Sequence, residues 1–312
     1  MKIQRVKNMS EDQFMEEYLI PKIPVIVTDA MQHWDVKRFT PDNLKEQFGD
    51  FEVQVYNNLF DLQTVDTLET YLNKNFDKKE TSIDAVIEYA RWFTKFRDID
   101  FFWSDEVFEA LKAYWQHPYF LPKKNMILPF DNGNKELNVH ESSFPYKGLF
   151  LSGKGGKTRL HKDPLNTNAL LCQLYGTKEL VLYSPDQESF LVQNNEYVDI
   201  DNPDLDKFPA YRNAAETYRD ILSPGEIVLF PSGWFHDVTS RTDSVSITWN
   251  FVHSRELNQF CEYLNTSLTE DQMEVVHFFI KDFLQDDTID AQSISSFYNK
   301  ISQKRKKHSL VL

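Results

Sequence analysis

The stretch TRLHKDPLNTNALLCQLYGTKELVLY, residues 158–183, places a histidine, a carboxylate and a lysine where a buried sheet is expected. His161 and Asp163 are two residues apart, and such residues point to the same side of a strand. A second histidine could join them from a neighbouring strand, and the best candidate is His236 in FPSGWFHDV. Two histidines and a carboxylate on one side of a metal form a facial triad that suits Fe(II). An H-x-D pair alone also fits a surface histidine beside an aspartate, so further features must decide.

Lys178 opens the next apolar segment, KELVLY, and shares a face with Leu180 and Leu182. A lysine that faces a core is unfavourable unless an anion pairs with it or its stem reaches water. The carboxylate of a bound small molecule would be such an anion. The alternative is a lysine at the first residue of a strand, still outside the core.

The segment SVSITWNFV, residues 244–252, alternates between an apolar and a polar face. Ser246, Thr248 and Asn250 form the polar face. Such a stripe usually meets solvent, although in a covered small barrel it can line a ligand cavity. The alternation alone favours solvent.

The composition limits the class of protein and its partners. The chain has 312 residues and a net charge of −14, which argues against nucleic acid as a partner because phosphates are bound by clustered lysine and arginine. Two cysteines, Cys172 and Cys261, have no metal-ligand spacing and suit reduced thiols. No signal region precedes the first helix pattern, and no apolar run approaches the roughly 20 residues of a membrane span. We therefore expect a cytoplasmic protein without a membrane segment.

The first part of the chain mixes helix and strand patterns. A capped helix is predicted in SEDQFMEEYL, with Ser10 as N-cap, and a second helix lies in FTPDNLKEQFGD between Pro41 and Gly49. KIPVIVTDA and FEVQVYN have strand patterns, and residues 82–117 are predicted to be mainly helical.

From about residue 147 the pattern changes to short strands separated by turns. These strands are YKGLFLSG, KELVLYSP, GEIVLFPSG and SVSITWNFV, and they indicate a sandwich or barrel. After residue 254 the helical period returns, with one apolar face running from Met273 to Phe283.

The order of these parts is specific: H-x-D, a turn, a strand with lysine, the turn SPGE, a strand, a histidine and a polar strand. In this order, residues 147–252 resemble the JmjC domain of the cupin superfamily of Fe(II)- and 2-oxoglutarate-dependent oxygenases. HKDPLNTNALLCQLYGTKELVLYSP resembles the first signature of that family, and LSPGEIVLFPSGWFHDV resembles the second. DIDNPDLDKFPAYRNA and IPVIVTDAMQHW look like segments of its asparaginyl and tRNA wybutosine hydroxylases.

The resemblance implies a site for iron and its co-substrates. His161, Asp163 and His236 would bind Fe(II), and 2-oxoglutarate and O2 would be consumed with it. We expect hydroxylation of a protein or peptide side chain. Hydroxylation of tRNA or of a small molecule, N-demethylation, and a non-catalytic cupin-like binding protein remain as alternatives.

The resemblance also implies residues for the co-substrate. Lys178 would pair with the far carboxylate of 2-oxoglutarate, Thr158 would hydrogen-bond it, and Thr248 and Asn250 would lie nearby. Thr158 and His161 are three residues apart, so a bulge must intervene if both face the cavity. Many relatives add a tyrosine from the preceding region, where this chain reads DFFWSDE, so we expect a different co-substrate pocket.

The implied fold is mainly β with helices: a double-stranded β-helix, or jelly roll, with an N-terminal α/β region and C-terminal helices. We expect a cupin-like catalytic domain over residues 1–254, with its β-helix core at about 147–252. Residues 255–312 would form a helical region, and by the resemblance this region could build a homodimer.

Overall fold

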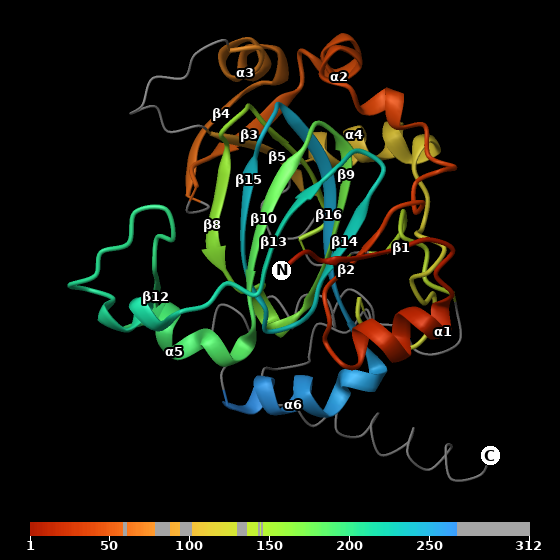
Figure 1. The fold of residues 1–312 in the computed structure, drawn as a ribbon. Helices are drawn as coiled ribbons and strands as arrows, with labels where there is room; N and C mark the ends of the chain where they lie inside the picture. The colour runs from red at the N-terminus through yellow and green to blue at the C-terminus, as the bar shows by residue number, and fades with distance from the viewer. Residues whose placement is uncertain are drawn as a thin grey trace, which may run out of the picture.

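The computed structural model describes residues 1–58, 61–78, 88–93, 102–129, 136–142, 144 and 146–266. Its strands form two facing sheets, and most of its helices lie at the two ends of these sheets (Figure 1).

In the described part of the chain, the large sheet has ten strands in the order β1-β2-β14-β9-β16-β7-β5-β3-β4, with β6 paired to β16. Its strands are Gln4–Val6 (β1), Val25–Val27 (β2), Glu52–Tyr56 (β3), Leu62–Thr67 (β4), Tyr89–Phe93 (β5), Met126–Leu128 (β6), Gly148–Ser152 (β7), Asn168–Tyr175 (β9), Ile227–Phe230 (β14) and Ser244–His253 (β16). The small sheet, within the same residues, has the order β13-β10-β15-β8. Its strands are Lys157–His161 (β8), Lys178–Tyr183 (β10), Tyr218–Leu222 (β13) and Phe235–Ser240 (β15).

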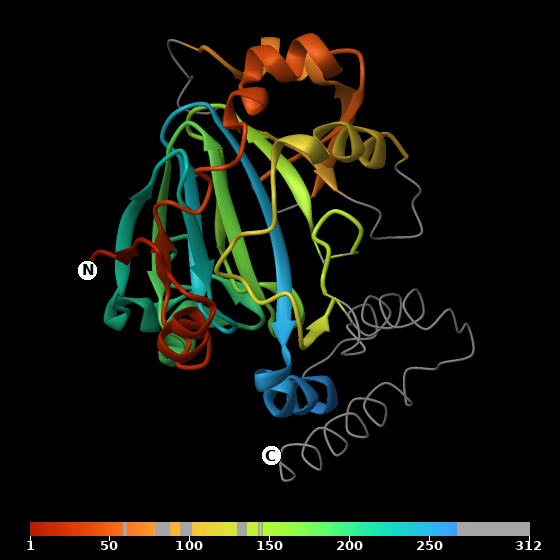
Figure 2. The same cartoon turned by 90° about the vertical axis from the view of Figure 1, so that its right-hand side faces the viewer.

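From β7 to β16 the chain crosses repeatedly between the two sheets. Strands β7, β9, β14 and β16 lie in the large sheet, and β8, β10, β13 and β15 lie in the small one. The turned view shows the two sheets enclosing a common interior (Figure 2). This winding is a double-stranded β-helix, so the fold prediction is confirmed. The insert between β10 and β13 carries a short hairpin of Val192–Gln193 (β11) and Glu196–Tyr197 (β12).

The N-terminal strands extend the large sheet at both of its edges. The fully buried β2 pairs antiparallel with β14, and β1 runs parallel to β2. At the other edge β5 pairs with β7, and β3 and β4 follow. The N-terminal region therefore completes the sheet of the barrel rather than forming a separate layer.

The prediction of helix over residues 82–117 is wrong for β5, which reads YARWF. Ala90 and Trp92 are buried on one face of this strand, and Tyr89 and Arg91 are buried on the other. Because both faces are buried, the segment does not show the apolar–polar alternation of a half-buried strand.

The helices begin largely where capping residues predict. Ser10 Oγ accepts a hydrogen bond from the backbone N–H of Gln13 at 3.0 Å, and Thr40 Oγ1 accepts one from Asn43. The helices are Glu11–Gln13 (α1), which continues as a π-helix over Phe14–Leu19, Pro41–Phe48 (α2), Leu68–Asn75 (α3), Phe102–Leu111 (α4), Glu188–Leu191 (α5) and Leu257–Thr266 (α6).

Helix α6 begins the predicted C-terminal helical region. The apolar face predicted from Met273 to Phe283 lies outside the described residues. Among the residues that the structure describes, no helix combines the length and apolar character needed to cross a membrane.

Candidate active site

His161, Asp163 and His236 lie together at one end of the barrel. One ligand atom from each lies within 4.8 Å of the other two. His161 ends β8 and pairs directly with His236 on β15, and His236 Nε2 lies 3.6 Å from Asp163 Oδ2. The Asp163 side chain is 14% exposed, so solvent reaches the cluster from its side. Two imidazoles and a carboxylate in this geometry could hold a divalent metal ion with open positions.

Backbone carbonyls set which nitrogen of each imidazole faces this cluster. Nδ1 of His161 lies 2.8 Å from the carbonyl oxygen of Arg159, and Nδ1 of His236 lies 3.3 Å from that of Trp234. With Nδ1–H donating to these carbonyls, Nε2 of each ring keeps its lone pair for a metal. The His236 ring also stacks on Phe230 with centroids 4.3 Å apart, which fixes its plane.

Burial keeps both imidazoles neutral. It lowers the pKa of His161 to about 3, assisted by the neighbouring His236, and it lowers the pKa of His236 to about 4. Burial also raises the pKa of Asp163, which His161 and the hydrogen bond from Asn250 oppose. A divalent cation fits this donor set, because it would stabilise the charged carboxylate and use the free imidazole lone pairs.

A hydrogen bond from Asn250 holds Asp163. Asn250 Nδ2 donates to Asp163 Oδ1 and to Thr167 Oγ1, each at 2.9 Å. In the turn between Asp163 and Thr167, Leu165 has a φ of 58°. This left-handed conformation is unfavourable for a branched side chain. These bonds therefore hold a strained turn that aims the carboxylate at the histidines. Asn250, expected near the co-substrate, contacts a candidate metal ligand directly.

Strand β8 contains the bulge that the spacing predicted. His161 pairs with His236, whereas Thr158 pairs with Val238. Three steps along β8 thus match two steps along β15, which is one extra residue on β8. The bulge allows Thr158 and His161 to face the same interior.

Lys178 lies inside the barrel and is 2% exposed, so the alternative of a lysine outside the core is wrong. Its Nζ donates to Ser246 Oγ at 3.1 Å and lies 5.3 Å from the centre of the Tyr89 ring. Burial lowers the pKa of Lys178, and the neighbouring Tyr89 opposes this shift. A carboxylate bound here would stabilise the ammonium group, as the sequence argument required.

The polar face of β16 also lines this interior, so the prediction from alternation alone, that it meets solvent, is wrong. Ser246, Thr248 and Asn250 are all buried. Ser246 contacts Lys178, whereas the Thr248 hydroxyl donates to the carbonyl oxygen of Leu170 at 2.8 Å. Thr248 can therefore offer a ligand only its oxygen lone pairs.

Tyr89 is a site residue that the sequence analysis missed. Its hydroxyl lies close to those of Thr158, Ser152 and Ser240, although none of these contacts has hydrogen-bond geometry. Burial raises the pKa of Tyr89, but Lys178 and these hydroxyls outweigh burial and lower it. The segment DFFWSDE holds no tyrosine, yet β5 supplies one beside the lysine. Tyr89 could have been identified from the sequence only if YARWF had been predicted to be a strand of the barrel.

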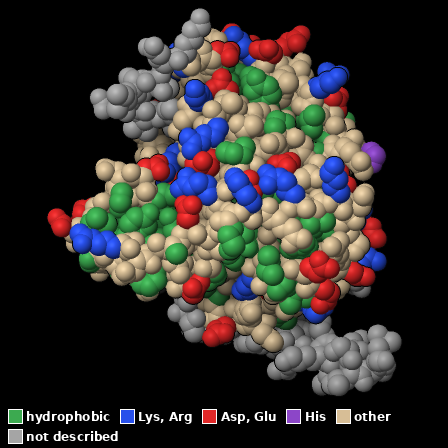
Figure 3. Space-filling view, in the orientation of Figure 1, with side chains coloured by type: hydrophobic (Ala, Val, Ile, Leu, Met, Phe, Trp, Pro, Cys, Tyr) green, Lys and Arg blue, Asp and Glu red, His purple; other side chains and the backbone are tan. Residues whose placement is uncertain are grey.

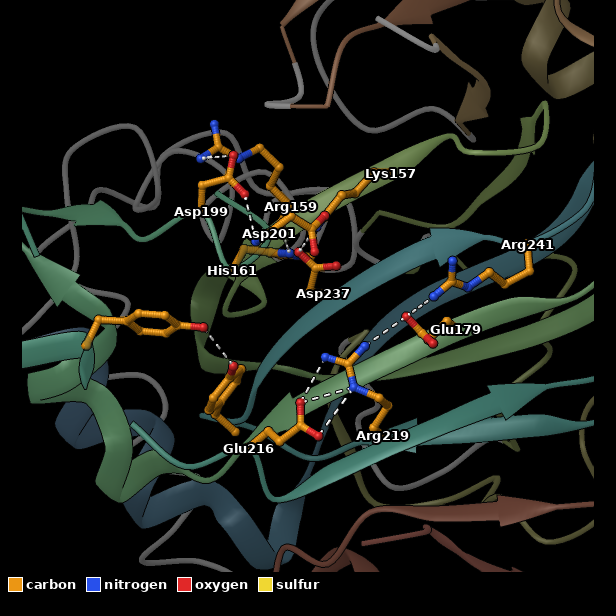
Figure 4. Close-up of polar contacts among 12 residues, drawn as sticks. Lys157, Arg159, His161, Glu179, Asp199, Asp201, Glu216, Arg219, Asp237 and Arg241 are labelled. Atoms are coloured by element: carbon orange, nitrogen blue, oxygen red, sulfur yellow. Dashed lines mark hydrogen bonds and ion pairs between the residues drawn. The ribbon is translucent and has the colours of Figure 1, made fainter. Parts of the chain in front are cut away.

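Two aspartates of the insert, Asp199 and Asp201, lie beside Arg159 and Lys157 of β8 (Figure 4). Lys157 pairs with Asp237 at 3.1 Å and also contacts Asp201, and Arg159 pairs with Asp199 at 3.3 Å. The contacts with Asp199 and Asp201 fasten the insert to the strand that carries His161, whereas Asp237 lies on the neighbouring strand β15.

A family model described as the cupin-like domain matches residues 11–258. The match covers the small sheet, every described strand of the large sheet except β1, and the cluster of His161, Asp163 and His236. The chain belongs to the cupin-like domain family. Within this family the relation to JmjC proteins is confirmed, since JmjC domain-containing protein D of Dictyostelium discoideum is 27% identical over 76% of this chain and 53% of its own length.

Three further relatives of this cupin-like protein extend over most of the chain. Human tRNA wybutosine-synthesizing protein 5 is 25% identical over 80% of this chain and 78% of its own length. Arginine-specific demethylase JMJ20 of Arabidopsis thaliana is 23% identical over 89% of the chain, and 2-oxoglutarate and iron-dependent oxygenase JMJD4 of Gallus gallus is 24% identical over 88%. The chain spans 63% and 65% of these last two proteins, which is less than two thirds of each.

Proposed function

We propose that this chain is an Fe(II)- and 2-oxoglutarate-dependent dioxygenase that hydroxylates a protein or peptide side chain. The observation that carries the proposal is the cluster of His161, Asp163 and His236 at the end of a barrel that buries Lys178. A relative named as a 2-oxoglutarate and iron-dependent oxygenase supports it.

The residues present fit the two groups that this chemistry needs. His161, Asp163 and His236 would hold Fe(II) through two Nε2 atoms and one carboxylate oxygen. Lys178 would pair with the far carboxylate of 2-oxoglutarate, and the Thr158 hydroxyl would hydrogen-bond it. When bound, these groups supply the oxidation: one atom of O2 enters succinate as 2-oxoglutarate loses CO2, and the other is inserted into a substrate C–H bond.

The chain itself positions these groups and excludes water from the surroundings of Lys178. Leu171, Leu180 and Val238 belong to a buried apolar cluster between the sheets. An apolar surrounding strengthens the pairing of Lys178 with a carboxylate, because the local dielectric is low. Asn250 holds the Asp163 carboxylate in place through its 2.9 Å hydrogen bond.

Two other readings of the same site deserve a test. The name of the human tRNA wybutosine-synthesizing relative supports a tRNA substrate, and the demethylase relative supports N-demethylation. A non-catalytic cupin-like binding protein is disfavoured, because it has no need for three metal ligands and a buried lysine.

We also propose that residues 1–254 form the catalytic domain and that residues 255–312 mediate a homodimer. A cytoplasmic location fits the absence of a spanning helix from the described residues.

Succinate formation tests the proposed activity. The full chain is incubated with Fe(II), 2-oxoglutarate and cell extract, and succinate is measured beside a metal-free control. We expect Fe(II)-dependent succinate, together with extract peptides that gain one oxygen atom. Failure to exceed the metal-free control would refute the proposal. Oxygen gain in a nucleoside digest, or loss of a methyl group, would favour the alternatives.

A further inference from the structure

We propose that Glu256 and Asn168 are positioning residues for the candidate metal site, because their hydrogen bond fixes the turn of Asp163 to the loop that precedes His236. This inference rests on the proposed function and identifies two residues, in addition to the ligand set, on which the site depends. Asn168 begins β9 directly after the turn that carries Asp163. Glu256 ends the 3-10 helix Ser254–Glu256, which follows β16 and leads into α6.

Asn168 uses both ends of its side-chain amide. Its Oδ1 accepts a hydrogen bond from the backbone N–H of Ser232 at 2.9 Å, and its Nδ2 donates to Glu256 Oε2 at 2.7 Å. Nδ2 also donates to the carbonyl oxygen of Phe251 on β16, at 3.3 Å. Asn168 is fully buried, so its amide depends on these protein contacts rather than on water. The side chain thus joins β9, β16 and the loop Pro231–Trp234.

The Glu256 carboxylate determines which way round this amide lies. Its Oε2 accepts from the backbone N–H of His253 at 3.2 Å as well as from Asn168. Because this oxygen acts as an acceptor, the NH2 group of Asn168 must face it, and the amide oxygen is left to face Ser232. The reversed amide would oppose its NH2 group to the N–H of Ser232, which is unfavourable inside the protein. Glu256 therefore keeps the Asn168 oxygen available to the loop.

The loop Pro231–Trp234 leads directly to His236 and supplies the group that orients its ring. Within this loop the N–H of Trp234 donates to the carbonyl oxygen of Pro231 at 3.2 Å, which closes a turn around Ser232. The carbonyl oxygen of Trp234 lies 3.3 Å from Nδ1 of His236. Holding Ser232 in place therefore also holds the carbonyl that keeps Nε2 of His236 directed at the cluster.

Asn168 is equally close to the support of Asp163. The preceding residue, Thr167, accepts a hydrogen bond from Asn250 Nδ2 at 2.9 Å, and the same amide donates to Asp163 Oδ1. Thr167 Oγ1 in turn donates to the carbonyl oxygen of Pro164 at 2.8 Å. A shift of the backbone at Asn168 would carry Thr167 with it and loosen the Asp163 carboxylate.

The hydrogen bond between Glu256 and Asn168 therefore affects two of the three candidate ligands at once. Distances from a metal ion to its ligands vary by only about 0.2 Å, so a loosened loop lowers the affinity for the ion. Groups that orient metal ligands typically contribute roughly ten- to a hundred-fold to that affinity.

Metal affinity, measured separately from stability, tests this role. Mn(II) and Co(II) are titrated into the full chain by calorimetry, and the absorption spectrum of bound Co(II) reports the geometry of its ligands. Glu256→Met keeps the length of the side chain but has no oxygen acceptor. It should weaken metal binding roughly ten- to a hundred-fold and change the Co(II) spectrum. Glu256→Gln should stay within about threefold of the wild-type affinity, because its amide oxygen can still accept from Asn168.

Glu226→Met is the matched control. Glu226 is also buried, and it also accepts from a backbone N–H three residues earlier, that of Ser223 at 2.8 Å, and from a side chain, that of Arg5 at 2.9 Å. It precedes β14, whereas Phe230 at the other end of that strand stacks on His236. Glu226→Met should lower the melting temperature and leave the metal affinity and the Co(II) spectrum unchanged.

Asn168→Thr breaks the same hydrogen bond from its other side, and it decides the question if Glu256→Met does not fold. The double variant should lose no more metal affinity than the more affected single variant, because both substitutions remove one interaction. A lower melting temperature with unchanged metal affinity in the folded variants would make the pair purely structural and overturn the inference. Additive losses would show that the two residues act independently, which also contradicts it.

The outcomes distinguish this inference from the proposed activity. If the variants lose metal affinity as expected but the wild-type chain never forms succinate, the positioning role is supported and the proposed dioxygenase activity is refuted. If the wild-type chain forms Fe(II)-dependent succinate and the variants keep their metal affinity, the activity is supported and the positioning role is wrong. A wild-type chain that binds neither Mn(II) nor Co(II) would refute both.

Discussion

Asp163 joins two parts of the site, since one of its oxygens faces His236 and the other accepts from Asn250. We expect Asp163→Ala and His236→Ala each to reduce turnover to background while the fold persists, because two remaining ligands hold Fe(II) poorly. Circular dichroism checks that the fold persists, calorimetry measures the loss of metal binding, and succinate formation measures turnover. Asn250→Ala removes a hydrogen bond to Asp163 but no ligand, so it should weaken metal binding less than Asp163→Ala or His236→Ala does. Near-normal metal binding and turnover in Asp163→Ala would show that the ligand assignment is wrong.

Lys178 is the buried cation expected to hold the co-substrate. Lys178→Ala should weaken 2-oxoglutarate binding roughly ten- to a thousand-fold, because it removes a charge-assisted pair from a desolvated place. Metal binding should change far less. Calorimetric titration of 2-oxoglutarate into the Mn(II)-loaded protein measures this difference.

Arg159 is the matched control for this measurement, because its guanidinium pairs with Asp199 at 3.3 Å at the edge of the site. Arg159→Ala should leave 2-oxoglutarate binding nearly unchanged. An unchanged affinity in Lys178→Ala, together with a large loss in Arg159→Ala, would transfer the carboxylate-binding role to Arg159.

At the scale of the element, the turn between β9 and β10 fixes where Lys178 enters the barrel. Gly176 has a φ of 70°, and a Cβ built there would lie 1.8 Å from the carbonyl oxygen of Asp243. Gly176→Ala should therefore destabilise the protein by clearly more than about 1 kcal/mol. Gly225→Ala is the control, since Gly225 has a φ of 88° but nothing within 4 Å of a Cβ. Equal losses in urea unfolding of the two variants would show that the steric contact is unimportant.

The core strands and the cluster of candidate ligands could be predicted because their signals are local. Each of the strands β7, β10, β14 and β16 carries its own alternation or apolar run and is bounded by turn residues. His161 and Asp163 belong to one short motif. The spacing of three from Thr158 to His161 predicted the bulge in β8 once the resemblance had implied that both residues face the cavity.

The remainder of the site depends on contacts between distant segments. Strand β5 is buried on both faces, so its five residues gave no period from which Tyr89 or Arg91 could be placed in the barrel. Likewise the hydrogen bond from Asn250 to Asp163 spans 87 residues and follows only from the pairing of the strands in the folded barrel.

At the scale of the whole molecule, the predicted homodimer depends on residues 267–312, which lie outside the described part of the chain. The apolar pattern from Met273 to Phe283 needs a surface to cover it, either the barrel of the same chain or a second subunit, and the family resemblance favours the second subunit. We expect the full chain to have the mass of a dimer by light scattering at micromolar concentration. A chain ending at Thr266 is the control and should be a monomer. A monomer mass for the full chain would contradict the prediction.

The outer face of the small sheet carries many basic side chains, but acidic ones lie beside them (Figure 3). Glu179 contacts Arg219 at 3.0 Å and Arg241 at 2.5 Å, and it lies between them in the close-up (Figure 4). Arg5 pairs with Asp220 at 2.9 Å. Arginines that are neutralised in this way are poorly suited to follow a phosphate backbone.

Salt dependence separates a peptide substrate from RNA. A chain with a net charge of −14 repels a polyanion, so RNA binding would require local phosphate contacts, and its affinity would fall steeply with salt. The logarithm of that affinity should fall by roughly 0.7 to 0.9 per phosphate contact for each tenfold increase in salt. A peptide held by backbone hydrogen bonds and apolar pockets should respond only weakly to salt. We expect weak salt dependence for a peptide substrate and no submicromolar tRNA binding. Tight tRNA binding with a steep salt slope, together with an oxidised nucleoside in the digest, would make tRNA the substrate.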